Sequence, residues 1–352
     1  MTTADLSHGI HQGDNPFEFD GARDLLQPTH PELPHYSETM FFIAVNPQSG
    51  DSVFVHVGRQ PGDLEMWWAQ TIAVLADGRI VADRSFGRAP DDRGPATGNL
   101  RITCVEPLRK WHMTFDGAGE LTNATEMATR VVGAGLAVRM SFHVEFSAAA
   151  PVCDFARILG SGAFDWANAH QEQNLWSKGQ LRIGDETFDV TGVGFRDHST
   201  GPRDFSKMGG DHFAFGGFPA SRRTFHSLVA WSRETEDVAI RMFGLYENGI
   251  YEIIPHVEMT GLRDNVSAEP RTVDFAIRRP GDDAFRVTAE VINHFTITLG
   301  YPNENINGAL LGRDDVLSSL AIVKFRWSDG ESGAGLVIRD YRPSTLPSER
   351  SR

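Results

Sequence analysis

Short segments with the pattern of β-strands follow one another along most of this 352-residue chain. Residues 136–146 read LAVRMSFHVEF and place an apolar side chain at every second position, which is typical of a half-buried strand. Residues 52–57 alternate in the same way, and similar segments recur at roughly 8–15-residue intervals up to Tyr341. Pairs that favour tight turns lie between or beside several of them, at 77–78, 116–117, 184–185, 248–249 and 329–330. The pattern predicts an antiparallel all-β protein of barrels or strongly curved sandwiches, with little helix.

The length of the chain predicts two domains, because a single hydrophobic core rarely grows to this size. Small and polar residues interrupt the strand pattern between residues 148 and 176, so we expect the domain junction near 150–180. This divides the chain into an irregular lead-in at 1–35, an N-terminal barrel at 36–165 and a C-terminal barrel at 180–352.

Several classes of protein are disfavoured by the composition. The formal net charge of −14 argues against a nucleic-acid partner, which calls for a basic surface. We expect no transmembrane segment, since no apolar run approaches the ~20 residues of a membrane helix, and no signal peptide. The two cysteines, Cys104 and Cys153, form no CxxC or zinc pattern and favour a cytoplasmic location. Phosphate-binding glycine loops and the GxSxG elbow are missing, so we expect no nucleotide cofactor and no serine-hydrolase chemistry.

The densest cluster of reactive side chains lies in residues 191–205, TGVGFRDHSTGPRDF. On a strand, Arg196 and His198 share one face and Asp197 the other, and the Gly-Pro turn could bring Arg203 and Asp204 back towards them. A histidine beside a carboxylate is the usual arrangement for general acid–base catalysis. Arginine–aspartate pairs also lock turns or join domains through bidentate contacts, so a purely structural role stays open.

Further candidates for ligand contact lie on predicted strands elsewhere. Trp67 and Trp68 are adjacent on a strand, so one indole points inward and the other outward. His212 and His226 could join His198 in an inward-facing trio, but without metal-ligand spacing we expect no metal. The residues predicted to bind substrate are Trp67, Trp68, His212, His226, Arg203 and Tyr246. The alternative to substrate binding is a structural role for each of these side chains, either in core packing or beside a surface turn.

The segment GVGFRDHSTGPRDF resembles the Asp-His-x-Trp signature of the carotenoid hydratase (hydroxyneurosporene synthase) and AttH-like family. It is more similar to a bacterial branch with the pattern Gly-x-Gly-x-Arg-Asp-His-Ser-x-Gly-x-Arg-Asp, which residues 107–117 and 325–341 also fit. The resemblance implies two tandem lipocalin-like β-barrels, apolar isoprenoid-type substrates, no redox cofactor, and Asp197 and His198 as the acid–base pair. Thr200 stands where the family has tryptophan, so a π-face that could stabilise a carbocation is missing.

These observations predict a cofactor-independent lyase-type enzyme, a hydratase, dehydratase or isomerising enzyme, that acts on a hydrophobic terpenoid, steroid or aromatic molecule in a barrel cavity. His198, oriented by Asp197 or Asp204, would move the proton, and Arg196 or Arg203 would neutralise developing negative charge. The alternative is a non-catalytic lipocalin-like carrier of the same class of ligand. The sequence leaves the formation of a homodimer open.

Overall fold

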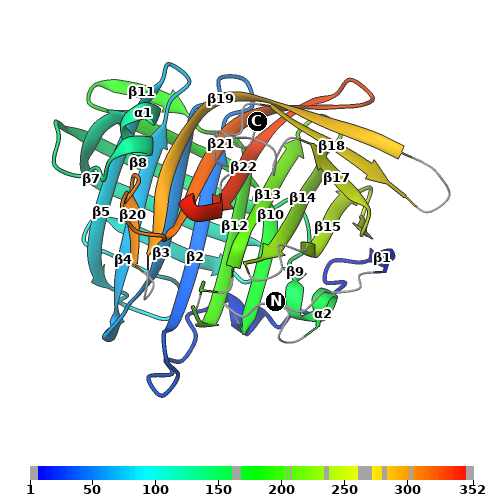
Figure 1. Ribbon diagram of the computed structural model, residues 1–352, viewed down its shortest axis with the longest axis horizontal. Helices are drawn as coiled ribbons and strands as arrows, with labels where there is room; N and C mark the ends of the chain where they lie inside the picture. Colours follow the sequence, from blue (N-terminus) through cyan, green and yellow to red (C-terminus); the bar gives the residue numbers. More distant parts are fainter. Residues whose placement is uncertain are drawn as a thin grey trace.

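The computed structural model describes residues 7–160, 168–203, 205–206, 208–233, 238–260, 272–279, 284–300 and 304–345. Within these residues the all-β prediction is confirmed (Figure 1), because the chain forms two large antiparallel sheets. The α-helices in these ranges are short: α1 (Ala124–Thr129) and α2 (Phe155–Leu159). Neither these nor any other helix among the described residues has the length and apolar character needed to cross a membrane.

The first sheet closes on itself as a barrel. Its strands pair in the order β2-β3-β4-β5-β7-β8-β10-β12, and β12 pairs with β2 again. β10 closes the ring, since residues 169–177 pair with β12 and residues 175–183 pair with β8. The bounds are β2 (Tyr36–Val45), β3 (Ser52–Gln60), β4 (Asp63–Val74), β5 (Arg79–Arg88), β6 (Leu100–Glu106), β7 (Lys110–Asn123), β8 (Ala137–Ala148), β9 (Cys153–Asp154), β10 (Ala169–Ile183), β11 (Glu186–Asp189) and β12 (Gly192–Pro202).

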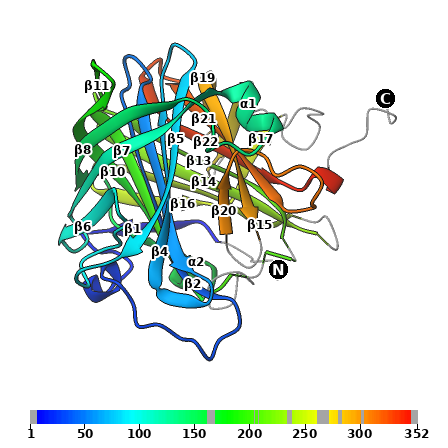
Figure 2. The same cartoon turned by 90° about the vertical axis from the view of Figure 1, so that its left-hand side faces the viewer.

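The second sheet curls around an aromatic core as an open barrel, called the second barrel below, because its strand order does not close among the described residues. Its strands pair in the order β1-β16-β15-β14-β13-β22-β21-β19-β18-β17, and β20 pairs with β19. Phe225, Phe243 and Phe275 come from different parts of this order and pack in one buried cluster. In Figure 2 most strands of the first sheet lie to the left of β13, β21 and β22 of the second sheet. The bounds are β1 (Gly9–Gln12), β13 (Met208–Phe218), β14 (Arg223–Ser232), β15 (Val238–Glu247), β16 (Ile250–Ile254), β17 (Val257–Thr260), β18 (Thr272–Arg278), β19 (Ala284–Gly300), β20 (Glu304–Asn307), β21 (Val316–Trp327) and β22 (Ser332–Tyr341).

The boundary between the sheets falls between β12 and β13, later than the junction expected near 150–180. The Arg-Asp-His segment was expected in the C-terminal barrel, but its strand β12 pairs with β2 and β10 and so belongs to the first barrel. The sequence pattern misplaced the junction because β10 begins with AHQEQN, which has the composition of a loop. These polar side chains are buried, at the end of the first barrel or between the sheets.

Two further segments differ from the sequence expectation. The lead-in is not wholly irregular: β1 adds an edge strand to β16, and a short 3-10 turn (Gly21–Asp24) reaches the first barrel through Asp24. The Asp116-Gly117 pair lies inside β7 and makes no turn, whereas the other four predicted turn pairs each connect two paired strands.

An apolar interface joins the two sheets. Successive residues of β2 and β12 point to opposite sides, so Phe42 packs inside the barrel while Phe41 and Phe195 face the second sheet. The Phe195 ring stacks on Phe215 of β13 at 4.3 Å between ring centroids, with 14° between the planes. The Asn174 side chain also donates a hydrogen bond to the Phe225 carbonyl across the interface, at 3.1 Å. The two barrels therefore share one continuous buried boundary, which holds the candidate site.

Candidate functional site

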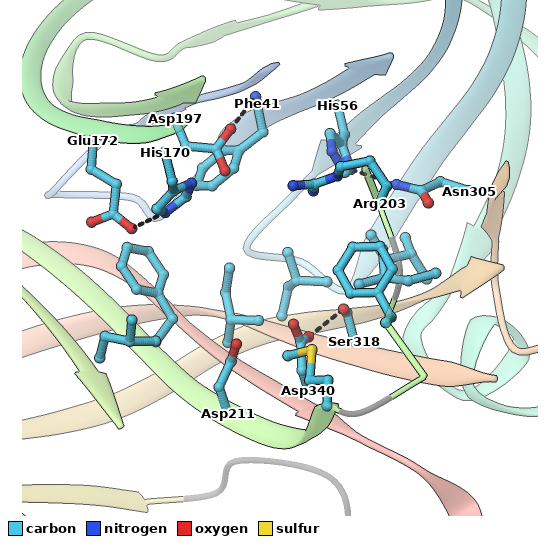
Figure 3. A pocket seen from close by; sticks show the side chains of 18 of the residues that line it. Phe41, His56, His170, Glu172, Asp197, Arg203, Asp211, Asn305, Ser318 and Asp340 are labelled. Carbon is cyan, nitrogen blue, oxygen red and sulfur yellow. Dashed lines mark hydrogen bonds and ion pairs between the residues drawn. The ribbon is translucent and has the colours of Figure 1, made fainter. Parts of the chain in front are cut away.

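A cavity of about 110 Å³ lies between the two barrels, not within either of them (Figure 3). The first barrel contributes side chains from the outer face of β2, β3, β10 and β12, and the second contributes side chains from β13, β14, β19, β20, β21 and β22. Most of the wall is apolar and includes Phe41, Phe54, Phe213, Leu320 and Ile338. Buried polar groups interrupt the apolar wall in three places.

The first polar group belongs to the first barrel. Asp197 on β12 accepts a hydrogen bond from the Phe41 backbone N–H at 2.9 Å, and burial raises the pKa of this carboxyl to about 6. His170 on β10 lies beside it and is held at both ring nitrogens. Its Nδ1 is 2.7 Å from Oγ of Ser199, and its Nε2 is 3.0 Å from Oε1 of Glu172. The imidazole is therefore fixed in orientation at the cavity wall.

Glu172 connects this wall to the second barrel. Its Oε2 lies 2.7 Å from Nδ1 of His226 on β14, and Nε2 of that ring is 2.6 Å from the Tyr251 hydroxyl. Burial opposes ionisation of Glu172, but the contacts with His170 and His226 outweigh it and hold the pKa of the carboxyl below its usual value. A buried carboxylate thus sits between two histidines, one from each barrel.

The second polar group lies on the opposite wall. Asp211 of β13 and Asp340 of β22 are direct partners in the strand register, and the Ser318 hydroxyl donates a hydrogen bond to Asp340. Burial raises the pKa of Asp340 to about 7. Burial and the neighbouring Asp340 raise the pKa of Asp211 well above its usual value. Since two adjacent carboxylates cannot both ionise easily away from water, the pair retains a proton near neutral pH.

The third polar group is His56, Arg203 and Asn305. Burial, with a smaller contribution from the Arg203 charge, lowers the pKa of His56 to about 3, so this imidazole is neutral. Its Nδ1 accepts a hydrogen bond from the Asn305 amide at 2.8 Å, which leaves the proton on Nε2. Burial lowers the pKa of Arg203 to about 10. This value is still well above neutral pH, so the guanidinium stays charged. These groups can donate hydrogen bonds to an oxygen atom of a ligand.

The structure separates the predicted catalytic residues. Asp197 and Arg203 line the cavity, but Arg196 and His198 point from the other face of β12 into the end of the first barrel. Arg196 is 2.8 Å from the Asp24 carboxylate, and Nε2 of His198 is 2.8 Å from Oε1 of Glu38. The expected pairing of Asp197 with His198 is thus corrected: alternation along the strand puts the two side chains on opposite sides. Asp204 lies outside the described residues.

The predicted substrate contacts also fall in different places. Trp67 is inside the first barrel under the Arg59 guanidinium, whereas Trp68 is on the cavity side, behind His56 at 5.2 Å between rings. Tyr246 packs near Tyr251, with 6.4 Å between ring centroids.

The expected histidine trio does not assemble. His198 is in the first barrel and His226 is at the interface. His212 is buried beside Trp231 on the side of β13 that faces away from the cavity, where burial lowers its pKa well below the usual value.

Sequence reasoning missed most of the polar cavity wall: His56, His170, Glu172, Asp211, Asn305 and Asp340. One available signal was a carboxyl side chain in a strand of mostly apolar and small residues, as for Asp211 in MGGDHFAFGGF and Asp340 in SGAGLVIRDY. A buried charge needs a partner or a function, so such positions mark candidate sites.

Comparison with known proteins places the chain by fold and by family. No curated protein sequence matches it. The structure of a candidate AttH protein from Nitrosomonas europaea superposes with a TM-score of 0.57 at 11% identity, over 88% of this chain and 93% of that one. The structure of kievitone hydratase from Nectria haematococca gives 0.52 at 9% identity, over 95% and 98%. At such identities the likeness shows the shared all-β, lipocalin-like fold alone. The family model described as a domain of unknown function, DUF7064, matches residues 20–340, and the chain belongs to that family.

Proposed function

We propose that this protein is an enzyme that transfers protons to and from a hydrophobic small molecule held between the two barrels, as a hydratase, dehydratase or related lyase or isomerase. One observation carries the proposal: buried carboxyl groups face the same apolar cavity from opposite walls, Asp197 on one side and the Asp211–Asp340 pair on the other (Figure 3). An apolar cavity with a few convergent polar groups is the usual form of a small-molecule site.

The two walls differ in protonation at neutral pH, and this suits acid–base chemistry. Asp197, with a pKa of about 6, is mostly ionised and acts as the base. The Asp211–Asp340 pair retains a proton and acts as the acid. In a dehydration the base takes a proton from carbon, the electrons of that C–H bond form the double bond, and the acid protonates the departing hydroxyl, which leaves as water. Hydration is the reverse of these steps.

The remaining groups have supporting roles. Arg203, His56 and Asn305 bind an oxygen of the substrate and stabilise negative charge that develops on it. The aromatic and aliphatic wall excludes water and suits the apolar part of a hydrophobic substrate around the reacting atoms. His170, held at its two ring nitrogens by Ser199 and Glu172, lies beside Asp197 and favours the ionised form of that carboxyl. Kievitone hydratase has a similar fold, and this supports the reaction class by analogy only.

The test can begin before the substrate is identified. Purified protein is incubated with a lipophilic extract of its source organism in oxygen-18-labelled water, and the products are compared by mass spectrometry. We expect wild type to change at least one compound by the gain or loss of one water molecule. Asp197→Asn should leave that compound unchanged, while Asp116→Asn, which alters a carboxylate with 71% of its side chain exposed, should behave as wild type.

Two results would contradict the proposal. Equal turnover by Asp197→Asn and wild type would remove Asp197 from the chemistry. The second contradicting result is a compound that co-purifies with the protein but is never altered, while no other compound in the extract changes. The protein would then be a carrier instead of an enzyme.

A further inference from the structure

Three side chains that can bind a metal gather on the outer face of the first barrel, away from the cavity. His112 is on β7, and His143 and Glu145 are on β8. In the strand register His112 lies directly opposite Glu145, and His143 is diagonal to it, opposite Thr114. Direct and diagonal neighbours on one face of a sheet are within reach of long side chains. The pairing of β7 with β8 therefore fixes the backbone positions of all three groups.

The side chains are already arranged around a common point. Nε2 of His112 is 3.6 Å from Oε1 of Glu145, and the rings of His112 and His143 are 5.2 Å apart between centroids with 82° between their planes. One ligand atom from each of the three residues lies within 4.8 Å of the other two. Ligand atoms around a tetrahedral zinc ion are about 3.3 Å apart, since the bonds are about 2.0–2.1 Å long. Small rotations of these partly exposed side chains would close the difference.

We propose that His112, His143 and Glu145 form a binding site for a divalent transition-metal ion, with Zn²⁺ as its typical occupant. Two imidazole nitrogens and one carboxylate oxygen are the donor set that such ions prefer, whereas Mg²⁺ and Ca²⁺ favour oxygen ligands alone. The side chains of His112 and Glu145 are 46% and 54% exposed, so at least one coordination position stays open to water or to another ligand. This site is independent of the cavity and of the reaction proposed there.

Lys178 competes with the metal ion for the Glu145 carboxylate. It lies directly opposite Glu145 on β10, the strand on the other side of β8. Its ammonium and a metal ion both favour the same carboxylate, so the lysine lowers the affinity for the metal. Removing the charge with Lys178→Met should therefore strengthen metal binding.

Isothermal titration of the chelator-treated full chain with Zn²⁺ tests the proposal, and Co²⁺ absorption spectra report the ligand geometry. We expect one equivalent to bind, roughly tenfold or greater weakening in His112→Ala/His143→Ala, and a smaller loss in Glu145→Gln. Mg²⁺ should not compete. His30→Ala is the matched control, because it removes an exposed histidine that also pairs with a glutamate, Glu32, at 2.9 Å.

Unaltered thermal unfolding without metal would verify that the variants fold, as expected for exposed side chains. Absence of zinc binding by wild type would overturn the proposal. So would an unchanged affinity in the double histidine variant, since the ion would then bind elsewhere.

Discussion

Asp211 and Asp340 are direct cross-strand partners on β13 and β22, and both are buried at one wall of the cavity. Like charges directly opposite each other in a sheet are unfavourable, and burial adds the cost of removing each carboxylate from water. The fold tolerates this arrangement because the pair holds a proton. It is a local source of instability that a purely structural interface would have no reason to retain.

This relationship predicts that Asp340→Asn stabilises the protein at high pH. The pKa of Asp340 is about 7 in the folded state against an ordinary value of 3.8, so folding favours the protonated form. The stability of wild type therefore falls as the pH rises between those two values. The variant removes this loss, and its amide oxygen can still accept the Ser318 hydrogen bond. We expect a gain of at least about 1 kcal/mol at pH 8 and little change at pH 4, measured by urea unfolding. A less stable variant at pH 8 would contradict the assignment.

The proposed reaction predicts a bell-shaped dependence of activity on pH. Turnover should rise as Asp197 loses its proton near pH 6, and fall as the Asp211–Asp340 pair loses its proton above pH 7. Asp197→Asn should lower kcat/KM by about 100-fold or more for the compound that wild type converts. The profile is measured on that compound. A rate that does not vary between pH 5 and pH 9 would exclude these carboxyls as the acid and base.

His198 gives a contrasting prediction, because it faces Glu38 and not the cavity. His198→Ala should reduce stability by about 1–3 kcal/mol, since Glu38 loses a buried partner. Glu38 keeps its contact with Arg59 at 2.8 Å, which limits the damage. Turnover should stay within about threefold of wild type, where a removed acid–base group would cost 10²–10⁴-fold. A folded variant that has lost its activity would instead restore His198 to the mechanism.

The residues of β12 and the Asp211–Asp340 pair show which features of the site could be predicted from the sequence. The strand pattern predicted the all-β fold, and alternation correctly separated Asp197 from Arg196 and His198. It could not say which face of β12 would meet the cavity, because both faces are buried, one by the barrel core and one by the second sheet. The Asp211–Asp340 pair joins β13 to β22, strands far apart in the chain, so only the tertiary fold brings the two carboxyls together.

Arg196 should be a residue on which folding depends. Its guanidinium is 1% exposed, contacts the fully buried Asp24 and donates a hydrogen bond to Gln173 at 2.9 Å. Arg196→Met leaves the Asp24 charge buried without this partner, so we expect a loss of about 3–5 kcal/mol in urea unfolding. Adding Asp24→Asn removes the stranded charge and should recover part of that loss. If the double variant is no more stable than the single one, the ion pair is not the source of the effect.

Glu172 links the two barrels, so its replacement should weaken their attachment. Glu172→Gln keeps the shape but removes the charge held between His170 and His226, and we expect a loss of about 2–4 kcal/mol at pH 7. Because these contacts lower the pKa of Glu172, their contribution is present above its ordinary value of 4.5 and is lost as the pH falls through the folded value. The difference between wild type and variant should therefore shrink in acid. Tyr251→Phe, which removes the hydroxyl that contacts His226 and Cys153, should cost about 1 kcal/mol. An equal cost for both variants, or a Glu172→Gln difference that does not depend on pH, would show that the carboxylate charge does not hold the barrels together.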